Sequence, residues 1–410
     1  MTRHTKTSLA NTLLATLGFG VLVATAPAMA QKQYDPGVTD TEIKIGNTIP
    51  YSGPASAYGI IGKTYTAFFK MINDQGGING RKINFISYDD AYSPPKSVEQ
   101  TRKLVESDEV FIDFAPLGTA SNAAIQKYLN QKKVPQLFVG SGASRWADPQ
   151  NFPWTIGLQP SYRSEARIYA TYILQNYPGK TIGVLYQNDD FGKDYILGLK
   201  DILKDKYEKL VISEASFEVS VPTVDSQVVA IKTANPDIFI NIGTPKFAAQ
   251  AIKKVAELNW HPVHIMTSVS ISPGQVMKPA GYENSQGILS SFYQMIVTDP
   301  GFEATPGMKR FRAFMEKYYP EADKTESGAL TAWNASTVLV EVLRKCGDNL
   351  TRENVMKQVA NLDMTVDTYL PGVRIKTSPT DFAPIEQLQM IKFSGDKWET
   401  FGPLIDSHQE

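Results

Sequence analysis

The sequence predicts an α/β protein with two doubly wound lobes, each built on a parallel sheet. Three observations support this fold class. Short apolar runs alternate with segments of helical periodicity from residue 42 to residue 144. The alternation breaks around Pro160 and then resumes, with the same design, from residue 165 to residue 268. The chain also has 410 residues, which is enough for two domains of ordinary size.

The first thirty residues are typical of a secretory signal peptide. Arg3 and Lys6 make a positive start, 9–25 is largely apolar and small, and 28–30 supplies a small-x-small cleavage pattern. A membrane anchor is the competing interpretation, but Asn11 and other polar residues dilute the apolar run below a spanning helix. We therefore expect the signal peptide, residues 1–30, to be removed and the mature protein to be periplasmic.

The first lobe begins with regular strand–helix alternation. Residues 42–48 alternate in polarity, as a half-buried strand does, and 49–59 forms a loop rich in Gly, Pro and Ser. Apolar residues recur at helical spacing in 61–73 and in 98–106, and a strand is expected between these helices at 83–88. This order favours parallel pairing, because parallel neighbours need a crossover connection.

The strongest functional signal comes from two glycine-hydroxyl turns that follow neighbouring strands. The predicted strands are 110–114 and 135–139, and a helix joins them. Gly118 and Thr119 follow the first strand, and 140–144 follows the second. Both turns therefore lie at one edge of the sheet, which is where ligands of open α/β sheets bind. Ordinary connecting turns are the alternative interpretation.

The second lobe repeats the order of the first. Its predicted strands are 181–186, 211–217, 237–242 and 265–268, and its predicted helices are 165–175, 195–204, 225–233 and 247–258. From Ile288 the pattern becomes less regular. Helices are expected there at 308–318, 327–345 and 352–359, and the clearest late strand is 388–393.

Composition and motifs exclude several classes of function. The net charge is −1, from 41 basic and 42 acidic residues, which argues against a nucleic-acid-binding protein. The sequence contains no nucleophile elbow, dinucleotide fingerprint or phosphate loop. His261 and His264 have no third ligand beside them in the sequence, so we predict no metal site. We therefore predict a binding protein without a cofactor, and not an enzyme.

Two pairs of aspartates follow predicted strands. Asp89 and Asp90 belong to the first lobe, and Asp189 and Asp190 belong to the second. Paired carboxylates can serve acid–base catalysis. Because the two pairs lie in separate lobes, we favour the interpretation that they cap helices or polar loop ends.

Hydroxyl-bearing and aromatic residues of the two lobes are expected to face each other across a cleft. Helix N-termini with neighbouring hydroxyl groups suit a carboxylate, and aromatic side chains suit an apolar body. Two such lobes can close on a small ligand by hinge motion. The candidates are Tyr58, Thr119, Ser121, Ser141 and Ser144 in the first lobe and Tyr162, Phe191 and Thr244 in the second.

Four segments resemble the type I solute-binding proteins of ABC importers, the leucine/isoleucine/valine-binding group. They are IGNTIPYSGPASAYG (45–59), NDQGGINGRKINFISYDDAYSP (73–94), KKVPQLFVGSGAS (132–144) and YQNDDFGKD (186–194). The resemblance implies two lobes joined by three crossovers. It places 42–158 and 290–372 in lobe one, and 159–289 and 373–410 in lobe two. It also implies a monomer that passes its ligand to a membrane permease.

The resemblance implies a set of ligand-binding residues. In the amino-acid-binding members, lobe one holds the ligand carboxylate through loops that match 117–121 and 141–144 here. Tyr58 matches a tyrosine of the first loop, and Phe191 matches an aromatic residue of lobe two. These loops add four residues to the candidates: Leu117, Gly118, Gly142 and Ala143.

The ammonium half of that site is where this sequence departs from the family. The matching positions are Thr244 and Ser268, and 267–270 contains no carboxylate. A buried ammonium group without a counter-charge costs several kcal/mol. We therefore expect a small carboxylate ligand with an aromatic or apolar body, such as a benzoate or a phenylpropanoid. The alternative is a protein for branched-chain or other amino acids whose ammonium partner lies elsewhere, for instance at Asp189 or Asp190.

Arg145 and Trp146 follow the second loop. They either add charge and stacking to the ligand site or cover the surface. A sensor module and a secreted α/β hydrolase are the remaining alternatives, but the sequence shows neither an output domain nor a nucleophile elbow.

Overall fold

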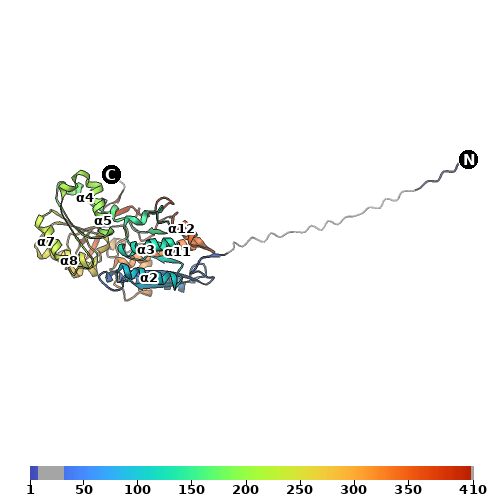
Figure 1. The fold of residues 1–410 in the computed structure, drawn as a ribbon, viewed down its shortest axis with the longest axis horizontal. Helices are drawn as coiled ribbons and strands as arrows, with labels where there is room; N and C mark the ends of the chain where they lie inside the picture. Colours follow the sequence, from blue (N-terminus) through green and yellow to red (C-terminus); the bar gives the residue numbers. More distant parts are fainter. Residues whose placement is uncertain (8–31, 408–410) are drawn as a thin grey trace.

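The computed structural model describes residues 1–7 and 32–407 and shows two α/β lobes (Figure 1). We call the part around a five-stranded sheet lobe one and the part around a seven-stranded sheet lobe two. In the first sheet all strands are parallel, in the order β3-β2-β4-β5-β6. Its strands are β2 (Glu42–Ile49), β3 (Lys82–Asp89), β4 (Ile112–Phe114), β5 (Gln136–Val139) and β6 (Thr155–Gly157).

The helices of lobe one come from two distant parts of the chain. The early helices are α1 (Gly59–Asp74), α2 (Pro94–Glu106) and α3 (Thr119–Lys132). The late helices are α10 (Pro306–Tyr318), α11 (Ser327–Cys346) and α12 (Arg352–Val359). α1 packs against β3, α10 and α11, so the late helices complete the layer that covers the first sheet. Two short pairings lie at the margin of this lobe, β1 (Gln33–Tyr34) with β12 (Asn349–Leu350) and β13 (Asp363–Met364) with β14 (Ile375–Lys376).

The sheet of lobe two has the order β16-β15-β11-β10-β9-β7-β8. Its parallel strands are β7 (Ile182–Gln187), β8 (Val211–Phe217), β9 (Ile238–Ile242), β10 (Val263–Met266) and β11 (Leu289–Phe292). An antiparallel hairpin of β15 (Gln387–Ser394) and β16 (Lys397–Asp406) extends the β11 edge. The helices are α4 (Tyr162–Asn176), α5 (Asp190–Leu203), α7 (Asp225–Ala234) and α8 (Pro245–Glu257), with short turns α6 (Tyr207–Leu210) and α9 (Lys278–Ala280).

The chain passes between the two sheets three times. It leaves the first sheet after β6, returns after β11 to form α10, α11 and α12, and ends in the hairpin of the second sheet. This topology confirms the predicted fold class of two α/β lobes with parallel sheets. β11 extends to Phe292, so 290–292 pair in the second sheet although the sequence-based division assigns them to lobe one.

The predicted signal peptide falls mostly outside the described residues, which include only its first seven positions. Within the described ranges, 1–7 and 32–407, no helix is both long enough and apolar enough to cross a membrane.

Candidate ligand-binding site

A cavity of about 110 Å³ lies between the lobes, at the carboxyl ends of the parallel strands. Ligands of α/β sheets bind at this end because helix N-termini and loops converge there. The volume is somewhat smaller than the roughly 150 Å³ of an engineered cavity that binds benzene, so the space suits a small ligand. The lining includes Tyr58, Tyr92, Leu117, Gly118, Thr119, Gln159, Tyr162, Phe191, Thr244, Ser268, Val269, Ser272, Tyr293, Glu326 and Thr331.

The start of α3 forms a polar wall in lobe one. Gly118 precedes the helix with φ of 105°, a conformation that favours glycine. A Cβ atom at Gly118 would lie 2.6 Å from the ring of Tyr92, so the loop also needs glycine for space. Thr119 is the first helical residue, and the unpaired backbone N–H groups of such a helix start attract a carboxylate.

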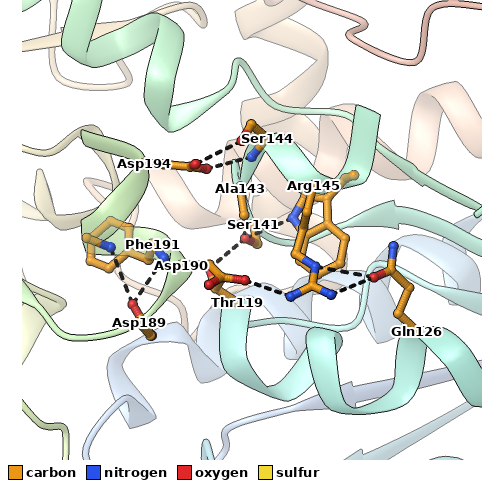
Figure 2. Close-up of polar contacts among 12 residues, drawn as sticks. Thr119, Gln126, Ser141, Ala143, Ser144, Arg145, Asp189, Asp190, Phe191 and Asp194 are labelled. Atoms are coloured by element: carbon orange, nitrogen blue, oxygen red, sulfur yellow. Dashed lines mark hydrogen bonds and ion pairs between the residues drawn. The ribbon is translucent and has the colours of Figure 1, made fainter. Parts of the chain in front are cut away.

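A hydrogen-bond chain orients the hydroxyl of Thr119. Ser141 Oγ accepts from the indole N–H of Trp146 at 3.1 Å and from the backbone N–H of Ala143 at 3.2 Å. Thr119 Oγ1 lies 2.7 Å from Ser141 Oγ (Figure 2). Because Ser141 already accepts two hydrogen bonds, its proton is best placed on Thr119 Oγ1. The hydroxyl of Tyr162 lies beside both of these side chains, so the proton of Thr119 has Tyr162 or a ligand in the cavity as its acceptor.

Aromatic side chains from both lobes form the apolar wall. The ring of Tyr162 meets that of Phe191 edge to face at 4.8 Å, and both pack on Tyr195. Tyr58 reaches across the cleft, where its hydroxyl donates to the carbonyl of Val269 at 3.1 Å. Burial holds the pKa of Tyr58 well above its usual value, so the hydroxyl stays protonated as a donor.

The hydroxyl groups of lobe two already have acceptors within the protein. Thr244, which precedes α8, donates to Gln187 Oε1 at 3.2 Å. Ser268 donates its backbone N–H to Glu165 at 2.8 Å and its hydroxyl to the same carboxylate at 2.6 Å. Glu165 lies on α4, is only 2% exposed and does not line the cavity. A carboxylate therefore stands behind Ser268, supplied by a segment about a hundred residues away in the chain.

Glu326 is the one acidic side chain among the described residues that line the cavity, and none of these residues is basic. It directly precedes α11 and is 5% exposed. Glu326 Oε1 accepts from Ser272 Oγ of lobe two at 2.8 Å. Burial raises the pKa of Glu326, and the hydrogen bond from Ser272 acts against that rise.

The second predicted loop, 140–144, connects the lobes through Ser144, and Arg145 next to it adds a second connection (Figure 2). Of the residues in this loop, Gly140 alone lines the cavity. Ser144 donates its backbone N–H and its hydroxyl to Asp194 of α5, at 2.6 and 2.8 Å. Arg145 forms an ion pair with Asp190 at 2.6 Å and also donates to Gln126 of α3. The charge of Arg145 is thereby directed to the joint between α3 and α5.

The structure divides the fourteen predicted ligand-binding residues into two groups. Eight of them line the cavity: Tyr58, Leu117, Gly118, Thr119, Tyr162, Phe191, Thr244 and Ser268. Six lie behind or beside it: Ser121, Ser141, Gly142, Ala143, Ser144 and Arg145. Of the two aspartates considered as ammonium partners, Asp189 caps α5 by accepting from the N–H groups of Phe191 and Gly192, and Asp190 pairs with Arg145.

Several lining residues were not among the predicted site residues. Gln159 precedes Pro160, at the break between the two halves of the fold. Tyr293 follows β11, and Glu326 and Thr331 lie at the start of α11. The sequence signal for these late residues is that they lie where a strand ends or a helix begins. Using that signal requires knowing that the chain returns to lobe one after β11, at its second crossover.

Comparisons with known proteins identify the family. The model of the family described as periplasmic binding protein matches residues 42–397. A Leu/Ile/Val-binding protein homolog of Brucella abortus is 23% identical over 341 residues, which cover 79% of this chain and 82% of that protein. The chain belongs to the periplasmic binding protein family, in its type I Leu/Ile/Val-binding group, as the sequence resemblance indicated. This membership also confirms the prediction of a binding protein that is not an enzyme.

Solved structures share the fold at lower identity. A branched-chain amino acid ABC transporter protein from Thermus thermophilus with bound valine has a TM-score of 0.80 and 15% identity, over 90% of this chain and 98% of that chain. A fatty acid ABC transporter substrate-binding protein from Thermomonospora curvata has a TM-score of 0.77 and 19% identity, over 92% and 95%.

Proposed function

We propose that this chain is the periplasmic ligand-binding subunit of an ABC importer and that it captures an amino acid with an apolar side chain. The observation that carries the ligand class is the charge of the cavity wall. Glu326 is its one acidic residue, and no basic residue stands among the described lining residues. Such a wall suits a zwitterion, whose own ammonium group can neutralise Glu326, better than it suits a simple anion.

The sequence alone favoured an aromatic or apolar organic acid, because no carboxylate follows the matching strand of lobe two. In the folded chain two carboxylates lie near that wall, Glu326 in the lining and Glu165 behind Ser268. The names of the Brucella and Thermus relatives also point to branched-chain amino acids. We therefore prefer the amino-acid ligand to the organic acid.

Capture follows from the arrangement of the walls. Thr119 and the N–H groups at the start of α3 hold the ligand carboxylate, and Tyr162 and Phe191 cover its apolar body. Tyr58 joins the lobes in the closed form through its hydrogen bond to Val269. The closed monomer is then recognised by the membrane permease, which receives the ligand. The predicted residues that line the cavity are the ligand contacts we propose.

A thermal-shift screen tests this function, because a ligand that binds only the folded state raises the unfolding midpoint. The protein is first unfolded and refolded so that any ligand carried over from expression is removed. We expect leucine, isoleucine or valine to raise the midpoint, and 4-hydroxybenzoate to leave it unchanged at the same concentration. A shift with aromatic acids and none with any amino acid would contradict the proposal.

A second candidate ligand is a carboxylic acid without an ammonium group. The sequence resemblance matches Thr244 and Ser268 to the positions that hold the ammonium group in the amino-acid-binding members, and neither is charged. The Thermomonospora structure is named as a fatty acid transporter protein. In this case Glu326 is protonated and donates a hydrogen bond. The same thermal-shift screen with linear and branched short-chain acids distinguishes this candidate from an amino acid, because only these acids would then raise the unfolding midpoint.

A further inference from the structure

Glu326 has the properties of a residue that selects the ligand by charge. It lies at the start of α11 in lobe one, borders the cavity and is almost fully buried. A buried carboxylate is costly unless hydrogen bonds or an opposite charge compensate it. Among the described residues, no Lys, Arg or His forms an ion pair with Glu326. Its partners are neutral groups of lobe two: the hydroxyl of Ser272 and the backbone N–H groups of Gly274 and Gln275, which supply hydrogen bonds but no full positive charge.

The backbone of lobe two is shaped to approach this carboxylate closely. A Cβ atom at Gly274 would lie 2.7 Å from Glu326 Oε1 and 2.9 Å from Asp323 Oδ2, so a larger residue there would displace these side chains. Asp323 raises the pKa of Glu326 further by its negative charge, after the larger effect of burial. The site thus combines two acidic groups and no protein cation, and a cation in the cavity would relieve both unfavourable effects.

We propose, building on the amino-acid ligand argued above, that Glu326 binds the ligand ammonium group. Lobe one then holds both charges of the zwitterion, the carboxylate at Thr119 and the ammonium at Glu326. The family resemblance instead places the ammonium on lobe two, at the positions of Thr244 and Ser268. Here those hydroxyls donate to Gln187 and Glu165, so their lone pairs can accept from an ammonium group, but neither side chain supplies the negative charge that Glu326 carries.

This assignment gives lobe one the capacity to bind the ligand before closure. Ser272 belongs to lobe two and donates to the same carboxylate, so Glu326 meets lobe two only when the lobes are together. The charge that recognises the ligand thereby also contributes to the contact between the lobes.

Calorimetric titration of two matched ligands separates ammonium recognition by Glu326 from its contribution to the contact between the lobes. L-leucine and 4-methylpentanoate share one carbon skeleton, and only leucine carries the ammonium group. We expect Glu326→Gln to weaken leucine binding about 10- to 100-fold, as for the loss of a hydrogen bond between charged groups. Binding of 4-methylpentanoate should change by less than about 3-fold or become tighter. An equal loss for both ligands, or no loss for leucine, would overturn the proposal.

Ser272→Ala is the matched control. It removes the hydrogen bond between the lobes and keeps the carboxylate, so it should affect the two ligands by the same factor. A selective loss of leucine binding in Ser272→Ala would also contradict the assignment to Glu326. Thermal unfolding of each variant without ligand checks that it is folded. If the wild-type protein binds no amino acid, the proposed function fails; if it binds leucine and Glu326→Gln binds it equally well, only the role of Glu326 fails.

Discussion

Ser144 and Asp194 join the two lobes through two hydrogen bonds to one carboxylate. The backbone N–H of Ser144 donates at 2.6 Å and its hydroxyl at 2.8 Å. Asp194 is 6% exposed, and burial raises its pKa while the two hydrogen bonds from Ser144 act against that rise. The loop that the resemblance associates with the ligand carboxylate thus gives its donors to α5.

Replacing Asp194 tests whether this joint is structural. Asp194→Ala leaves both donors of Ser144 without an acceptor, so we expect the free energy of unfolding to fall by about 2 to 3 kcal/mol. Urea denaturation measures the loss. Asp194→Asn keeps one acceptor oxygen, so its free energy of unfolding should lie between those of the wild type and Asp194→Ala. A loss of ligand affinity with unchanged stability would instead place Asp194 among the ligand contacts.

Arg145→Ala tests the alternative roles of that residue. The side chains of Arg145 and Asp190 are 34% and 49% exposed, and such partly exposed pairs contribute about 0 to 1 kcal/mol. Because Arg145 does not line the cavity, we expect the affinity for leucine to change by less than about 3-fold. A loss of leucine affinity of about tenfold or more, measured in a binding titration, would show that the guanidinium acts on the ligand.

Thr119→Val tests the carboxylate wall. Valine keeps the shape of threonine but lacks the hydroxyl proton that we assign to the ligand, so the dissociation constant should rise about tenfold or more. Ser121→Ala is the control on the same helix, since Ser121 is buried and does not line the cavity. Equal effects of the two substitutions on ligand affinity would rule out a specific role for Thr119.

Asp113 predicts a pH dependence of stability. Burial, and then the charge of Asp90, raise the pKa of Asp113 to about 8, and neither of its oxygens has a hydrogen-bond partner among the described residues. In the unfolded chain the pKa is about 4, so between about pH 4 and pH 8 only the folded state keeps the proton. The folded state therefore binds more protons than the unfolded state, and stability falls as the pH rises through this range.

Asp113→Asn removes this dependence. We expect the stability of the variant relative to the wild type to rise by up to about 4 kcal/mol between pH 5 and pH 8, because each pH unit in this range costs the wild type about 1.4 kcal/mol. Thermal unfolding at both pH values measures the difference. An equal stability difference at pH 5 and pH 8 would mean that folded Asp113 has already lost its proton at pH 5, which would contradict its raised pKa.

More of the fold than of the ligand-binding site could be predicted from the sequence. The strands expected at 110–114 and 135–139 appear as β4 and β5, because apolar runs followed by glycine turns define buried parallel strands by local signals. The loops around Tyr58 and Thr119 could also be placed from their positions after strands. Glu326 could not, since only the second passage of the chain between the lobes, after β11, brings it to the cavity.

Side-chain partners set a second limit on sequence-based prediction. Nothing local indicates that Ser268 points its hydroxyl at Glu165, or that Ser144 meets Asp194, because these pairs are 103 and 50 residues apart. Long-range partners decide whether a hydroxyl is free for a ligand. The expectation of an organic acid arose from Thr244 and from the sequence around Ser268, and it did not include Glu165 or Glu326.

The structure of the complex with L-leucine tests the central claim most directly. The measurement is the position of the ligand charges in the cavity between the lobes. We predict the carboxylate within about 3 Å of Thr119 Oγ1 and the ammonium nitrogen within about 3 Å of a carboxylate oxygen of Glu326. A ligand bound outside this cavity, or with its ammonium group directed to Ser268 and away from Glu326, would contradict the account.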